Sequence, residues 1–133
     1  MDIESSAKRI RETLGAQLGD DLYAVGWYDR DGDPRTGVAY MNDRFTESVS
    51  ADGDAHTILD DALLGRFGPS THGMLGEPAV ASSTIYERFV DVHVYFGGDR
   101  GVVVALNRDA DASTDRIVET ARDHAPDDGD AAD

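Results

Sequence analysis

The chain has 133 residues, enough for one domain with its own hydrophobic core, and 40% of them are apolar. It carries 27 acidic and 12 basic residues, a formal net charge of -15, which weighs against binding nucleic acid through an extended basic patch. The absence of cysteine excludes disulfides and thiolate metal sites. No run reaches the roughly 18 apolar residues of a membrane span. The N-terminal MDIESSAKRIRETLG lacks the pattern of a secretory signal, so a cytoplasmic protein is expected.

The make-up of the charge is more informative than its size. The acids are 21 Asp and 6 Glu, whereas the bases are 11 Arg and one lysine, Lys8. Short carboxylates hold water and cations at a surface, and the long apolar stem of lysine favours salting-out. At about 1 M salt the Debye length falls to about 3 Å, so self-repulsion is largely screened. Because the charge is spread along the chain, we interpret it as halophilic adaptation rather than a site for a basic partner.

The first expected element is a helix over residues 2–18. Its apolar residues recur at spacings of three and four, which places them on one stripe: Ile3, Ala7, Ile10, Leu14 and Leu18. Gly19 follows and can end the helix in a left-handed conformation.

Residues 21–29 and 35–43 predict a β-hairpin around the turn RDGDP. Strict alternation gives both faces of the first strand bulky apolar groups, with Tyr23, Val25 and Trp27 on one face and Leu22, Ala24 and Tyr28 on the other. Either helices cover both faces, or a second copy or a partner covers one face or the sheet edge.

A second helix is expected over residues 54–67, with Asp54 as its N-cap. Its apolar positions repeat with helical period: Ile58, Leu59, Ala62, Leu63 and Phe67. The breaker-rich stretch GPSTHGMLGEP then predicts a loop over 68–78.

Three strands and a helix complete the pattern, with strands expected over 79–88, 89–96 and 101–107. In the middle one the alternation sets Val90, Val92, Val94 and Phe96 inward and Phe89, Asp91, His93 and Tyr95 on the opposite face. The run GVVVALN is the most apolar and is expected to be a central strand. Asp111 or Ser113 caps a final helix that carries Ile117, Val118 and Ala121.

The element order is therefore α-β-β-α-β-β-β-α. Five short strands with hairpin links favour an α+β fold, a five-stranded antiparallel sheet packed by helices, as one domain over residues 1–125. Residues 126–133, PDDGDAAD, are expected to form a disordered acidic tail.

Two motifs suggest ligand sites but fit turns better. Asp29, Asp31 and Asp33 alternate as in a calcium loop, yet the sixth and twelfth positions hold Pro34 and Tyr40 instead of glycine and glutamate. The segment GGDRG at 97–101 has neither a phosphate-binding lysine nor a dinucleotide-binding glycine spacing, and it joins two strands.

The histidines give no clear catalytic pattern. His56, His72, His93 and His124 are not at metal-ligand spacing, and no serine or cysteine nucleophile has a recognisable elbow around it. We therefore expect a protein that is not an enzyme, with no catalytic residue, metal or cofactor.

Two resemblances add to this interpretation. The segments LYAVGWYDRDG, AYMNDRF and VHVYFGGDRGVVVALNRDAD resemble a small family of acidic haloarchaeal proteins with no assigned activity. The element order from 3 to 124, with its last strand and helix GVVVALNRDADASTDRIVETARD, is similar to the Roadblock (dynein light chain) superfamily and its longin and profilin-like relatives. That resemblance implies a sheet between helices, frequent dimerisation and a role as a platform or regulator for small GTPases.

The expected function is that of a non-catalytic interaction or regulatory domain, which forms a homodimer and serves as a platform for a small GTPase or signalling protein. The candidate partner or ligand surface comprises Trp27, His72, His93 and Tyr95. One alternative is a PAS-like or profilin-like sensor in which the 68–78 loop closes a ligand pocket over His93 and Tyr95. The other is an enzyme with His72 or His93 as base.

Salt dependence tests the interpretation of the charge. Since the carboxylate surface needs cation shielding, the melting temperature should rise steeply between low salt and molar KCl. Thermal unfolding followed by circular dichroism measures this, and an unchanged melting temperature over that range would contradict halophilic adaptation.

Overall fold

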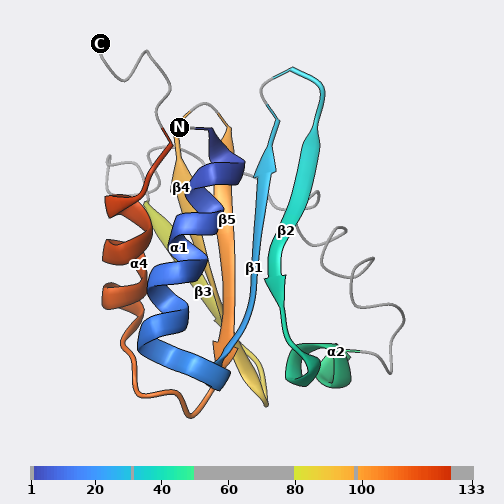
Figure 1. Ribbon diagram of the computed structural model, residues 1–133, viewed down its shortest axis with the longest axis vertical. Coiled ribbons are helices and arrows are strands. Elements are labelled where there is room, and N and C mark those ends of the chain that lie inside the picture. The colour runs from blue at the N-terminus through green and yellow to red at the C-terminus, as the bar shows by residue number, and fades with distance from the viewer. Residues whose placement is uncertain (1, 31, 50–79, 98, 127–133) are drawn as a thin grey trace, which may run out of the picture.

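The computed structural model describes residues 2–30, 32–49, 80–97 and 99–126, and Figure 1 shows their arrangement. In chain order the elements are α1 (Ile3–Leu18), a 3-10 turn (Gly19–Asp21), β1 (Leu22–Asp29), β2 (Arg35–Met41), α2 (Asp43–Val49), β3 (Ala81–Ile85), β4 (Phe89–Phe96), β5 (Arg100–Asn107) and α4 (Thr114–Asp123). The α+β class and the order α-β-β-α-β-β-β-α are confirmed. The helix expected over 54–67, the 68–78 loop and the tail beyond Pro126 lie outside the described residues.

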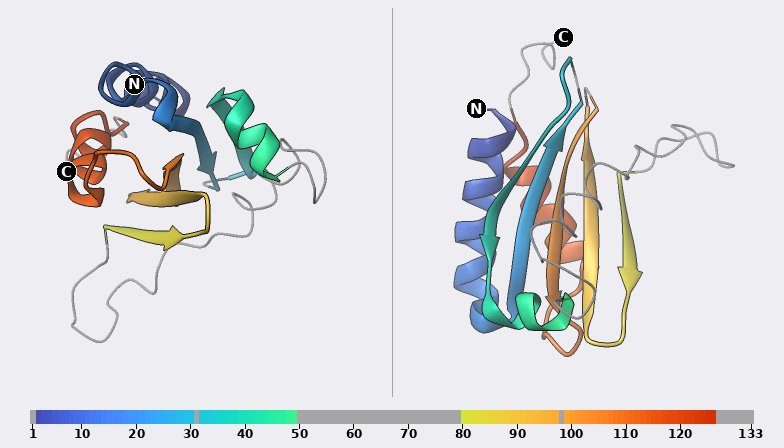
Figure 2. Two further views of the ribbon diagram at one scale, coloured as in Figure 1. Left: turned by 90° about the horizontal axis from the view of Figure 1, so that it is seen from below. Right: turned by 90° about the vertical axis from the view of Figure 1, so that its right-hand side faces the viewer.

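The five strands form one open sheet in the order β2-β1-β5-β4-β3, and every neighbouring pair is antiparallel. β5 lies at the centre, as its apolar sequence predicts, and its residues Gly101–Leu106 are all buried. β2 and β3 are the two edge strands, which Figure 2 shows on opposite sides of the sheet.

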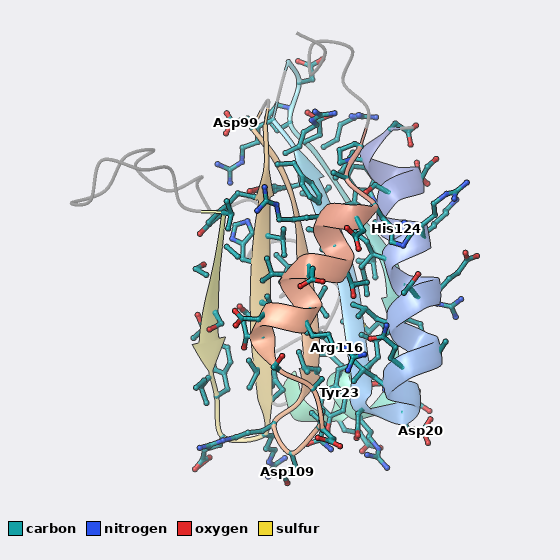
Figure 3. The ribbon with its side chains drawn as sticks, turned by 90° about the vertical axis from the view of Figure 1, so that its left-hand side faces the viewer. Asp20, Tyr23, Asp99, Asp109, Arg116 and His124 are labelled. Atoms are coloured by element: carbon teal, nitrogen blue, oxygen red, sulfur yellow. The ribbon has the colours of Figure 1, made fainter. Side chains whose placement is uncertain are left out.

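Helices α1 and α4 lie side by side on one face of the sheet (Figure 3). The stripe expected on α1 meets the inward valines of β4 and β5 there, in a core that contains Ile3, Ile10, Leu14, Val92, Val94, Val102, Val104 and Ile117. The buried hydroxyl of Ser6 donates a hydrogen bond to the carbonyl of His124, which fastens the end of α4 to α1.

The helix ends follow the sequence signals. The Asp2 carboxylate accepts a hydrogen bond from the amide of Ser5 at 2.8 Å, and this bond lowers the pKa of Asp2. The cap therefore weakens as the pH falls through that lowered pKa. Gly19 ends α1 with φ of 56°, and Ser113, one of the two expected caps, begins α4.

The face assignment predicted for β1 is wrong at its first two residues. Leu22 lies with Val25 and Trp27 in the helix-covered core, whereas Tyr23 lies with Ala24 on the opposite face. The cause is a register shift between Leu22 and Ala24 in the pairing with β5, an irregularity that interrupts strict alternation.

The second face of the sheet carries α2, a short helix that periodicity did not predict. Asn42 precedes it: its side-chain oxygen accepts from the amide of Phe45 at 2.9 Å, and its side-chain amide donates to the carbonyl of Leu22 at 2.9 Å. Phe45 is buried against Tyr23, Ala24 and Ala105. This helix is thereby fixed against the start of β1.

Candidate functional site

Trp27 is part of the core and offers little surface to a partner. Its side chain is 7% exposed and belongs to the helix-covered cluster. A Cβ atom on Gly37, its neighbour on β2, would lie 2.4 Å from the indole ring, so only glycine leaves room for it. Trp27 therefore leaves little exposed surface for the partner contact expected there.

His93 and Tyr95 lie together on the second face of the sheet, as alternation along β4 predicts. His93 is 1% exposed, and its Nε2 atom shares a hydrogen bond of 2.8 Å with the hydroxyl of Tyr28. The two rings meet edge to face with centroids 5.3 Å apart. Gly101 makes this contact possible, because a Cβ there would lie 2.5 Å from the Tyr28 oxygen.

The contact continues from His93 toward the edge of the sheet. The ring centroids of His93 and Tyr95 are 4.2 Å apart, and the Tyr95 hydroxyl shares a hydrogen bond of 2.8 Å with Ser82 Oγ on β3. We call Tyr28, His93, Tyr95 and Ser82 the polar line. It joins the buried centre of the second face to the exposed edge strand.

Asp91 lies on the same face, two residues before His93, and is also buried. The second face thus buries a carboxyl group and an imidazole, although sequence alternation identifies it as the polar face. Burying such groups is costly unless they are hydrogen-bonded, so the polar line constrains how β1, β4 and β3 pack. His93 is 1% exposed and its Nε2 atom is engaged by Tyr28, so the imidazole presents almost no surface to solvent.

His72, the other candidate base, lies outside the described residues. The turn after Asp29 is a hairpin, as expected, with Gly32 at φ of 91° and the Asp29 carboxylate paired to Arg35 at 3.1 Å. Within the described ranges, no three His, Asp or Glu side chains gather as a metal site requires. None of the helices described there is both long and apolar enough to cross a bilayer.

The large apolar side chains that are exposed among the described residues lie on β3 or directly beside it. Ile85 is 66% exposed, and the residues that flank the strand, Val80 and Tyr86, are 41% and 43% exposed. Tyr86 stacks on Phe89 with centroids 4.6 Å apart, which fixes the end of the strand against β4. This edge was not singled out from the sequence, where residues 79–88 have weak alternation.

The fold and these contacts define an α+β domain with an open antiparallel sheet, one face covered by α1 and α4 and the other organised by the polar line. The chain belongs to the family described as Domain of unknown function (DUF7522), whose model matches residues 8–126. Neither a curated protein nor a solved structure matches the chain.

Two phenylalanine variants test the buried end of the polar line against its exposed end. Tyr28→Phe removes a hydroxyl that partners a buried imidazole and should lower the free energy of unfolding by about 1–3 kcal/mol. Tyr95→Phe removes an exposed bond to Ser82 and should cost about 0.5 kcal/mol or less. Denaturant unfolding at fixed KCl measures both free energies. Equal decreases in the two variants would show that burial does not determine how much each hydrogen bond of the polar line contributes to stability.

Proposed function

We propose that this protein is a non-catalytic interaction domain that forms a homodimer through the outer edge of β3. An edge strand presents backbone N–H and C=O groups that its single neighbour does not satisfy, and a second chain can pair with them. β3 bonds to β4 on one side, and it is the last strand in the sheet order.

The exposed apolar side chains on this edge carry the proposal. Ile85 and Tyr86 lie at one end of the strand and Val80 at the other, so a second strand paired along this edge would pass beside all three. Burial of apolar surface stabilises association by roughly 25 cal/mol per Å² before the costs of ordering are subtracted.

Charge also favours β3 as the contact. Two copies of a chain with net charge -15 repel each other, most strongly wherever carboxylates would face carboxylates. The segment Val80–Tyr86 contains no charged residue. Two such segments can approach without bringing charges of the same sign together, and salt screens the repulsion that remains.

The opposite edge is less suited to the same role. Residues Thr36–Met41 of β2 are all partly buried, whereas four of the five residues of β3 are exposed. Tyr40 is also covered by the guanidinium of Arg11, which lies 5.0 Å from its ring centroid. Less of the β2 edge is therefore open to a second chain.

In a dimer that pairs through β3, the face covered by α1 and α4 in each copy would lie outside the contact and stay accessible to another protein. We extend the proposal to a platform role for a small GTPase or another signalling protein, supported by the element order and the resemblance to Roadblock domains. The buried setting of His93 supports the non-catalytic part of the proposal.

A single substitution on the edge strand tests the dimer. Ile85→Glu places a carboxylate in each copy at the proposed contact, and because the side chain is 66% exposed it should leave the fold intact. The dimer dissociation constant in molar KCl should rise about tenfold or more. Light scattering and sedimentation measure it.

Gln17→Glu is the matched control, because it adds the same charge at an exposed position on α1. It should leave the dissociation constant within about twofold. A wild-type protein that stays monomeric at high concentration, or an Ile85→Glu variant that dimerises as well as the control, would refute the β3 contact.

A further inference from the structure

An open hollow of about 420 Å³ lies at the end of the sheet where β2, β3 and β5 terminate. Tyr23 and Asn107 line it together with six charged side chains, Arg44, Arg88, Arg108, Glu47, Glu87 and Asp109. Figure 3 labels Tyr23 and Asp109 at this end of the molecule.

Topology explains why three arginines from distant segments meet. β2, β3 and β5 run in the same direction in the antiparallel sheet, so their ends lie at one edge, which Figure 1 shows near α2. Arg44 follows β2, Arg88 follows β3 and Arg108 follows β5. A sequence with only 11 arginines thus places three of them around one hollow.

The backbone that carries these arginines is firmly held. The amide of Arg108 donates to the carbonyl of Arg88 at 3.3 Å, which joins the turn after β3 to the turn after β5. Arg44 lies on α2, whose Phe45 meets Phe89 edge to face with centroids 5.7 Å apart. Side chains on such fixed segments lose less freedom when a ligand binds.

The guanidinium groups are available for a ligand. In the part of the chain that the structure describes, no ion pair joins an arginine of this hollow to one of its carboxylates. Arg108 donates one long bond of 3.4 Å to the carbonyl of Tyr86. Arg44 and Arg88 have neither an ion pair nor a side-chain hydrogen bond among the described residues.

We infer that this hollow binds a small phosphate monoester that also carries hydroxyl groups. The planar guanidinium forms paired hydrogen bonds to phosphate oxygens, and a dianion is best matched by more than one arginine. The neighbouring carboxylates of Glu87 and Asp109 can accept hydrogen bonds from hydroxyl donors. The volume of about 420 Å³ lies within the range of small-molecule sites.

Calorimetric titration with glycerol 3-phosphate at constant KCl tests the site. Wild-type protein should bind it saturably and more tightly than inorganic phosphate, because only the ester has alcohol hydroxyls that can reach the carboxylates while its phosphate group contacts the arginines. Arg88→Gln and Arg108→Gln should each weaken binding about tenfold or more. Arg9→Gln, at an exposed position on α1 away from the hollow, should change it less than twofold.

Three results would overturn the inference. One is the absence of saturable binding to the wild-type protein. Another is equal affinity for inorganic phosphate, which would remove the role of the carboxylates. The third is an Arg9→Gln effect as large as that of Arg88→Gln, which would mean that net charge alone attracts the anion. Circular dichroism of each variant verifies that the fold is kept.

Discussion

The antiparallel pairing of β5 with both β1 and β4 is the interaction on which the remaining structure depends. β5 is buried from Gly101 to Leu106, and its two neighbours pair with it along nearly their whole length. Alternation along these three strands then places one set of side chains under α1 and α4 and the other set on the second face, which carries the polar line. Because further strands add only at the outside, β2 and β3 become edges and the strand ends gather at one end of the sheet.

The two faces of this sheet have different chemistry. The helix-covered face is packed with aliphatic side chains such as Ile10 and Val94, and its contacts are non-directional. The second face combines apolar contacts around Phe45 with directional contacts among Tyr28, His93 and Tyr95, which end at Ser82 on β3. The edge proposed to bind a second copy is therefore linked to the buried imidazole of His93 through the exposed hydrogen bond between Tyr95 and Ser82.

The placement of residues with a clear hydrophobic period was predicted from the sequence. The placement of residues whose surroundings depend on strand pairing was not. The hydrophobic pattern alone indicates which residues are buried in the stripe from Ile3 to Leu14 and among the valines of β4 and β5. The sequence therefore predicted α1, β4 and the central place of β5. α2 was missed because Asp43–Val49 is too short to show a period. The misplaced Tyr23 reflects an irregular register, and the arginines of the hollow become neighbours only once the sheet order is known.

We propose that the charged surface keeps the protein hydrated while its uncharged edge strand forms the contact with a second copy. Amide hydrogen exchange along Ala81–Ile85, followed as the wild-type protein is diluted in molar KCl, tests it most directly. If the claim is correct, amides of β3 that do not bond to β4 are protected at high concentration and lose that protection on dilution. Rapid exchange of those amides at every concentration would contradict it.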